Sequence, residues 1–342
     1  MMAGQGQNYH VTEGEVGLTV IQGLRRWLPA QSWSQLRKLI SGCQVQMNGN
    51  LCRDEGRRLK ANDVVKVLAH AQSAPPTIGD VKIQYLDAQV VVVEKPSGMT
   101  TLRHAEERNW PARRKQLQPT LDEVLPRLIE QQSGGRPKAG GKKKPPGKHK
   151  PGRIRPVHRI DRDTSGLLVF ARTPEAEQKL IQQFRKHTTH RIYWAVVHGT
   201  IEAQTFESHL VRDRGDGHRG STTLPDTGQR AVTHIRPIEP LGDYTLIECQ
   251  LETGRTHQIR IHLSEAGHML CGEKTYDQPL FKKKVPDTSH APRLALHARE
   301  LGFVHPVTGE ELKFQMGLPP DLARFVDRLR QEAKGKKAPR ES

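Results

Sequence analysis

The most informative stretch of this chain is HRIDRDTSG at residues 158–166, followed by the apolar run LLVFA at 167–171. It places cations and carboxylates directly before an apolar run with the length of a buried strand. Ionised groups are costly beside apolar surroundings unless they are paired, so their presence there favours a functional role. We therefore predict a core strand over 167–171 and a functional site in the loop that precedes it.

The composition is that of a folded, water-soluble protein. The chain has 342 residues, 35% of them hydrophobic, which is enough for one large and one small domain. No apolar run approaches the roughly 20 residues that a membrane helix needs, and residues 1–7 lack the pattern of a secretory signal. We predict a cytoplasmic protein without a membrane partner. No Cys-x-x-Cys pair is present, so reduced, buried thiols are expected at Cys43, Cys52, Cys249 and Cys271.

The net charge of +17 points to an anionic partner, and nucleic acid is the usual one. Residues 133–155 hold nine Lys or Arg and no acid, and residues 334–342 hold four against one acid, so only about +5 remains elsewhere. The 133–155 segment is rich in Gly, Pro and Lys and lacks the apolar residues of a packed element. We predict a disordered basic insertion there and a flexible basic tail over 331–342. The composition of the insertion fits a solvated linker and a tether for RNA phosphates equally well.

The N-terminal region, residues 12–75, has the pattern of a small α+β domain. Ser32 or Ser34 can cap a helix that ends at Gly42. Two alternating strands follow, at 45–47 and 64–67, with an Asn-Gly turn after the first. This region is similar to the S4 RNA-binding domain, and a generic α+β packing module is the alternative.

Local patterns also predict the elements of the larger region. One helix is predicted after the cap Thr120 and another over 173–184, and the predicted strands begin at Val90, Arg191 and Tyr244. A strand-like segment is expected at 257–262. It would point His257 and His262 to opposite faces, so we predict structural roles for both and for His158, and no metal site.

Four ordered motifs resemble those of the RluA-type, or large-subunit type, RNA pseudouridine synthases. The first is residues 158–166, where Ile160 replaces the Leu of the family's His-Arg-Leu-Asp. The others are the Lys-Pro-x-Gly of 95–98, the Tyr-x-Ala-x-Val-x-Gly of 193–199 and the Thr-Gly-Arg signature of 253–263. The resemblance covers roughly residues 83–322 and is weakest over 103–155.

This resemblance implies an α+β pseudouridine synthase fold with a mixed, mainly antiparallel central sheet flanked by helices and loops. We therefore expect a catalytic domain over 80–325, preceded by the S4-like domain over 12–75.

The resemblance also implies the chemistry. Asp161 would attack the ribose or the base of a target uridine, Tyr193 would lie against the base and remove the C5 proton, and Arg255 would pair with the Asp. Arg260 is close enough in sequence to be the alternative partner. A neighbouring Arg lowers the pKa of an Asp by roughly 1 to 3 units, which keeps the carboxylate ionised. No metal or cofactor is expected.

RNA is the expected partner, with ribosomal RNA favoured and transfer RNA possible, and the expected oligomeric state is a monomer. By resemblance, Arg159 would enter the base stack when the uridine flips out. Further RNA contacts are expected from Arg162, Arg260, Arg37 and Lys38.

Less specific interpretations exist for the same residues. Asp161 can be a structural ion-pair partner of Arg159 or Arg162, and Tyr193 can be a core aromatic residue. A phosphohydrolase with an Asp-x-Asp pair fits poorly, because that class has Thr or Val two places after the second Asp, where this chain has Ser165. A catalytically silent S4-type RNA-binding or ribosome-assembly protein is the remaining alternative, although binding alone has no need of an anion facing RNA phosphates.

Overall fold

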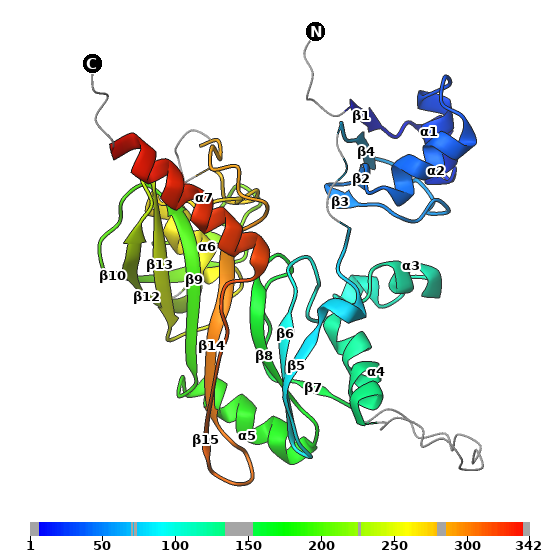
Figure 1. The fold of residues 1–342 in the computed structure, drawn as a ribbon. Helices are drawn as coiled ribbons and strands as arrows, with labels where there is room; N and C mark the ends of the chain where they lie inside the picture. Colours follow the sequence, from blue (N-terminus) through cyan, green and yellow to red (C-terminus); the bar gives the residue numbers. More distant parts are fainter. Residues whose placement is uncertain are drawn as a thin grey trace, which may run out of the picture. The chain divides into compact units, whose positions relative to one another are not determined.

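The computed structural model describes residues 7–69, 71, 74–133, 153–224, 227–278 and 285–337, and the chain divides into two compact units (Figure 1). The smaller unit consists of Met1–Pro75 and His104–Pro119, and the larger of Pro76–Arg103 and Thr120–Ser342. Most of the predicted basic insertion lies outside the described residues, as does the end of the predicted tail. Residues 331–337 belong to a helix, so the first part of the predicted tail is helical.

The smaller unit packs short helices against an antiparallel sheet with the strand order β1-β4-β2-β3. Its core is formed by apolar residues of the helices at 20–27 and 33–41 and of the sheet, among them Leu24, Leu36 and Val65. The strands are β1 (Gln7–His10), β2 (Val45–Met47), β3 (Asn50–Leu51) and β4 (Val64–Val67). The α-helices are α1 (Val20–Trp27), α2 (Trp33–Ser41) and α3 (Ala112–Leu117), and the short 3-10 helices are η1 (Glu13–Glu15) and η3 (Ala105–Glu107).

The helix predicted after the serines is α2. Ser32 caps it by accepting a hydrogen bond from the backbone N–H of Gln35, and Gly42 ends it. Helix α1 and strand β1 were not predicted. The signal for α1 was present in the sequence, because Thr19 and Gln22 form the same reciprocal capping box.

The larger unit is built on an 11-stranded sheet whose main path runs β11-β10-β12-β13-β9-β14-β8-β6-β5, with β15 beside β14 and β7 beside β8. Among the described strands, β8 and β14 pair in parallel and the other pairs are antiparallel. This confirms the predicted mixed, mainly antiparallel sheet. Every residue of β8 is buried, as its apolar sequence predicts.

The larger unit has eleven described strands and five described helices. The strands are β5 (Lys82–Leu86), β6 (Val90–Lys95), β7 (Arg155–Pro156), β8 (Ser165–Ala171), β9 (His190–His198), β10 (Gln204–Val211), β11 (Gly220–Thr222), β12 (Gln229–Pro240), β13 (Tyr244–Leu251), β14 (Leu296–Val304) and β15 (Glu311–Gln315). The helices are η2 (Ile78–Asp80), α4 (Leu121–Ser133), α5 (Pro174–Arg185), α6 (Gln258–Glu265) and α7 (Pro320–Lys337). These bounds confirm the helices predicted after Thr120 and over 173–184. They also confirm the strands predicted from Val90, Arg191 and Tyr244.

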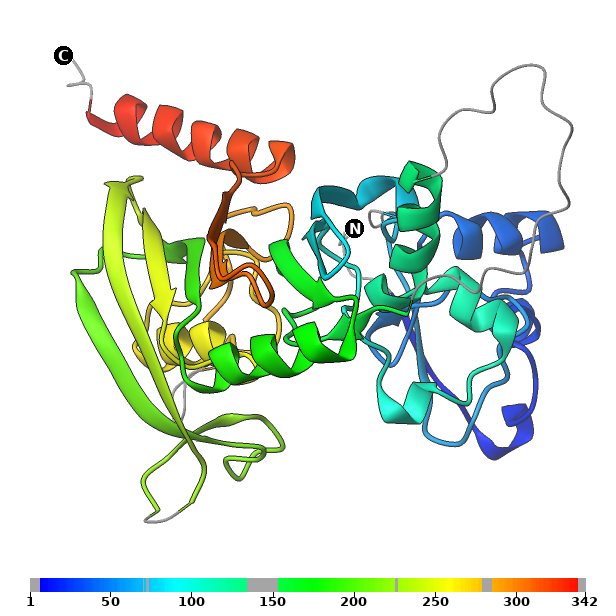
Figure 2. The ribbon, with the colours of Figure 1, turned by 90° about the horizontal axis from the view of Figure 1, so that it is seen from below.

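Helices α6 and α7 cover opposite sides of β9 and β13 (Figure 2). Side chains of a strand alternate between faces. Ala195 of β9 accordingly belongs to the same buried cluster as Ile259 of α6, whereas Val196 belongs to the cluster that includes Phe325 of α7. Tyr193, a predicted site residue, belongs to the cluster on the α6 side.

The four cysteines are buried and unpaired, as predicted. None of the helices in the described ranges is long and apolar enough to cross a membrane.

Candidate active site

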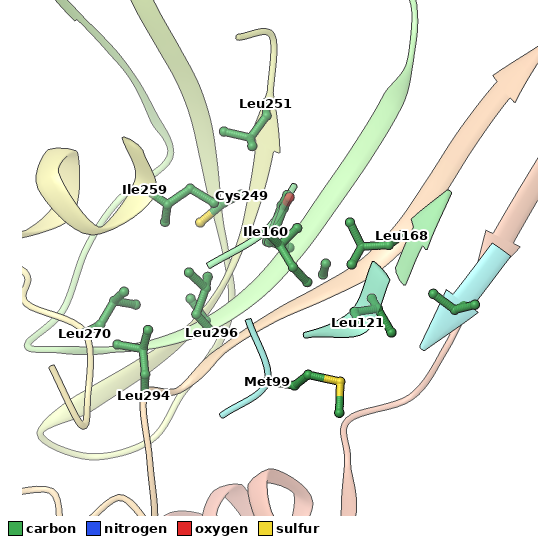
Figure 3. Packing of buried hydrophobic residues seen from close by; sticks show 14 of the residues in the cluster. Met99, Leu121, Ile160, Leu168, Cys249, Leu251, Ile259, Leu270, Leu294 and Leu296 are labelled. Carbon is green, nitrogen blue, oxygen red and sulfur yellow. The ribbon is translucent and has the colours of Figure 1, made fainter. Parts of the chain in front are cut away.

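Asp161 lies in the loop that leads from β7 into the central strand β8, and its side chain is 17% exposed. Its neighbour Ile160 is buried in the main hydrophobic cluster, where Figure 3 shows it close to Cys249. On the other side, Thr164 is buried and its backbone N–H donates to the carbonyl of Asp161 at 3.2 Å. The loop is thus fixed on both sides of the carboxylate.

The backbone conformation and the surroundings of Gly166 explain why the motif ends with a glycine. Its φ is +126°, and a Cβ at this position would stand 2.2 Å from the carbonyl oxygen of Ala298 on the parallel neighbour β14. A side chain is excluded here on both grounds. The close approach of β14 therefore sets where β8 begins and where the Asp161 loop ends.

The end of β6 and the segment that follows it hold the same loop through hydrogen bonds. The buried Lys95 ammonium donates to the carbonyl of Arg162 at 2.9 Å and also to those of Pro96 and Met99. Thr101 Oγ1 donates to the carbonyl of Ile160 at 2.8 Å. Burial lowers the pKa of Lys95 to about 7. We did not predict a site role for Lys95, although a lysine at the end of a valine strand was a signal for one.

Arg260 is the arginine beside Asp161, with 3.7 Å between its Nη1 and the carboxylate. The expected pairing of Arg255 with Asp161 is wrong. Arg255 lines the same cavity, but its Nε donates to the backbone carbonyl of Arg230, and it makes no ion pair within the described part of the chain. The two arginines differ because residues 258–265 form helix α6, whose first turn brings Arg260 inward.

Arg260 is held in place by Glu273. Its Nε and Nη2 donate to the two oxygens of this carboxylate at 2.8 and 2.6 Å, and both side chains are almost completely buried. Burial alone would lower the pKa of Arg260 and raise that of Glu273, but their mutual attraction shifts both in the opposite sense. Arg260 is thus a rigid, permanent cation next to Asp161. Because the side chain of Arg260 is only 7% exposed, its position does not support the RNA contact that was expected of this residue.

The strand expected at 257–262 is also wrong. His257 has a left-handed backbone conformation (φ 61°) and starts α6. Its Nε2 lies 3.8 Å from Asp161, and its Nδ1 is hydrogen-bonded to the hydroxyl of Tyr276, so it joins the site. His262 is buried between Ser208 and Thr233, which agrees with a structural role.

His158 has the structural role that was predicted for it. Its Nε2 accepts the backbone N–H of Val169 at 3.1 Å, and its ring stacks on Phe184. Burial lowers its pKa to about 3, so the imidazole is neutral and a stable acceptor at physiological pH.

Tyr193 projects from the middle of β9 into the same cavity as Asp161. Its register partners are Ala298 on β14 and Cys249 on β13, so its position is fixed by strands on both sides. Burial raises its pKa to about 12, with the Asp161 charge adding to the shift. The phenol is therefore the form present in the resting site.

The cavity has a volume of about 480 Å³, which lies in the range of sites for small molecules. The polar side chains that line the cavity include Asp161, Tyr193 and several arginines. Apolar side chains such as Phe184 and Leu296 also form part of its wall. Arg159 also lines it, although this residue as a whole is exposed.

The remaining predicted RNA-binding residues are exposed. Arg162 pairs with Asp163 at 3.1 Å, and Arg37 of α2 pairs with Glu55 at 3.2 Å. Lys38 is exposed on α2. Exposed pairs of this kind contribute about 0 to 1 kcal/mol, so both arginines could exchange a carboxylate for a phosphate at small cost.

One group of possible metal ligands occurs among the described residues, and it is separate from Asp161. Ligand atoms of His198, Cys271 and Asp287 lie within 4.8 Å of one another. Asp287 already accepts hydrogen bonds from His198 and from the backbone N–H groups of Gly272 and Ser289. Burial raises the pKa of Cys271 to about 12, which disfavours the thiolate that a metal needs. The group is explained as a hydrogen-bonded turn.

Comparisons with known proteins agree with this geometry. The family model described as RNA pseudouridylate synthase matches residues 89–265. The chain is 35% identical over 320 residues to the ribosomal large subunit pseudouridine synthase D of Zymomonas mobilis, which covers 91% of this chain and 94% of that protein. It is 36% identical over 307 residues to the uncharacterized RNA pseudouridine synthase YlyB of Bacillus subtilis, covering 87% and 90%.

A solved structure is similar in fold. Human RNA pseudouridylate synthase domain containing 4 aligns with a TM-score of 0.53 at 24% identity, covering 72% of this chain and 92% of that chain.

Proposed function

Because the chain belongs to the RluA-type RNA pseudouridine synthase family, and is thus an isomerase that acts on uridine in RNA, we propose that Asp161 is its catalytic residue. The observation that carries this proposal is the position of Asp161. It is the carboxylate in the cavity that also holds Tyr193, and Arg260 and His257 lie within 4 Å of it. A carboxylate so placed has the guanidinium of Arg260 beside it and remains accessible to a ligand.

The reaction needs an ionised carboxylate whichever atom it attacks. Attack on the ribose displaces the base from C1′, and attack on the base at C6 adds to the ring; both require a lone pair on Asp161. In either case the N1–C1′ bond breaks, the uracil turns and a C5–C1′ bond forms. The bond to Asp161 is then released, the C5 proton is lost, and N1 gains a proton. The rigid Arg260 fits the carboxylate in both routes, since it does not need to move during the reaction.

Arg159 is proposed to occupy the place of the flipped uridine. Its residue is exposed, yet it lines the cavity two positions before Asp161. A cavity with a buried carboxylate cannot be reached by a base that remains stacked, and unstacking costs a few kcal/mol. A guanidinium that stacks in the vacated position would recover part of this cost.

Tyr193 is proposed to take part in removal of the C5 proton as its phenolate: the phenol, whose pKa is raised to about 12, first gives its own proton to solvent, and the phenolate oxygen then takes the proton from C5. Replacing Tyr193 by Phe should therefore slow tritium release from RNA labelled at uridine C5 by about 10²- to 10⁴-fold, the usual contribution of a general acid or base. Consumption of uridine, measured by chromatography of nuclease-digested RNA, should slow much less.

Tyr244→Phe is the matched control, because Tyr244 lies on the neighbouring strand β13 outside the cavity lining. Equal slowing of tritium release and uridine consumption in the Tyr193 variant would exclude a specific role in the C5 step.

Ribosomal RNA is the proposed target, acted on by a monomer. The name of the Zymomonas mobilis relative supports this target, as does the S4-like pattern of residues 12–75 with the exposed Lys38. Pseudouridines mapped in total RNA from cells with and without the gene should differ at one or a few ribosomal RNA positions. A difference confined to transfer RNA would replace the proposed target, and no difference in any RNA would favour a silent RNA-binding protein.

A further inference from the structure

Arg191 is a buried cation that the reaction described so far does not use. It lies on β9 two residues before Tyr193, lines the cavity that holds Asp161, and is only 7% exposed. Residues two apart on a strand share a face, which places it next to Tyr193. A buried guanidinium is costly unless its charge is compensated.

No carboxylate compensates Arg191 within the described residues. Its Nη2 donates to the backbone carbonyl of Glu252 at 2.7 Å and, more weakly, to that of Leu251 at 3.5 Å. Its Nε has no hydrogen-bond partner. Arg260, the other arginine buried in this cavity, has both Glu273 and Asp161. The guanidinium of Arg191 also lies over the ring of Phe184, with 5.6 Å between Cζ and the ring centroid. A cation without a carboxylate partner and with an unused Nε donor thus remains in the wall of the cavity.

The reaction creates a negative charge that could serve as the missing partner of Arg191. When the N1–C1′ bond breaks, its electron pair stays with the uracil and is delocalised over O2 and O4. If Asp161 first attacks C6, the electrons of the C5–C6 bond likewise move toward O4. The pyrimidine therefore carries the charge in either route. A phosphate is a poorer candidate, since it would have to leave the solvent to reach a side chain that is 93% buried, whereas the base must enter the cavity in any case.

Resting on the proposed function, we propose that Arg191 is a further catalytic residue, which donates a hydrogen bond to a carbonyl oxygen of the uracil and stabilises the negative charge that develops on it. Preformed donors aimed at developing charge in a site shielded from water are among the largest contributions to catalysis. Gly254 fits this assignment, because a Cβ there would stand 2.6 Å from Nη1 of Arg191 and displace the guanidinium.

Arg191→Gln is the decisive variant. It removes the charge and keeps a neutral donor at about the position of Nε, although the shorter amide does not reach the carbonyl of Glu252. We expect kcat to fall about 10²- to 10³-fold, as for loss of one oxyanion donor, with KM changed less than about threefold and an unchanged melting temperature. Arg236→Gln on β12, an exposed arginine paired with Glu248, is the matched control and should retain full activity.

A second substrate separates a catalytic from a structural role. RNA with 5-fluorouridine at the target position releases a less basic pyrimidine, which needs less stabilisation. The defect of Arg191→Gln, measured as single-turnover cleavage of the N-glycosidic bond, should therefore be smaller with this RNA than with uridine. A merely structural role predicts the same defect for both substrates and would overturn the proposal.

Two other outcomes also overturn it. An unchanged kcat would exclude the contact with the base, and a rise in KM alone that disappears with a neutral methylphosphonate linkage would assign Arg191 to a phosphate. Asp161→Asn is measured alongside. If that variant is active, the proposed function itself fails; if it is inactive while Arg191→Gln is fully active, only the assignment of Arg191 fails.

Discussion

Replacing Asp161 by Asn is expected to abolish pseudouridine formation while changing RNA affinity by less than a few fold. Asn has the shape of Asp but no charge and no nucleophilic lone pair on an anionic oxygen. The backbone of the loop should not move, because it is held by Lys95, Thr101 and the buried Ile160 rather than by the carboxylate. Loss of a group on which the chemistry depends costs at least about 10⁴-fold in kcat.

Tritium release from RNA labelled at uridine C5 measures this loss under single-turnover conditions, and filter binding measures the affinity. Asp163→Asn is the matched control, because it makes the same change of charge two residues away on a side chain that is 43% exposed. It should lose far less activity. Undiminished release by the Asp161 variant would place the chemistry on another residue.

Replacing Arg260 by Met should both destabilise the fold and remove activity. The substitution leaves Glu273, 4% exposed, without the guanidinium that neutralises it. Removing one partner of a buried ion pair typically costs about 3–5 kcal/mol, because the other charge stays buried and unpaired. Activity should fall as well, since Asp161 loses the cation 3.7 Å away.

A double variant separates these two effects. Arg260→Met with Glu273→Gln removes both charges, so it should recover most of the stability measured by denaturant unfolding but none of the activity. Glu273→Gln alone keeps Arg260 beside Asp161 and should retain part of the activity. Full activity in the double variant would show that Asp161 does not need this arginine.

Elements whose signals are local in the chain could be predicted from the sequence. The serine cap of α2, the alternation of β13 and the uninterrupted apolar run of β8 each involve a few consecutive residues. Helix α6 could not be predicted in the same way. Its start depends on the left-handed conformation of His257, whose ring is held by Tyr276, nineteen residues later.

By itself, the sequence determined the family and the class of fold and singled out Asp161 as the candidate nucleophile, because the motif around this residue is contiguous and requires no knowledge of distant contacts. Only the tertiary structure decided which cations serve it. Arg260 and Arg255 are equivalent in sequence, and what distinguishes them is the carboxylate of Glu273, which folding brings to one and not to the other. The unpaired charge of Arg191 is likewise a property of all its neighbours together. Electrostatic compensation depends on distances in space, and no local pattern encodes those.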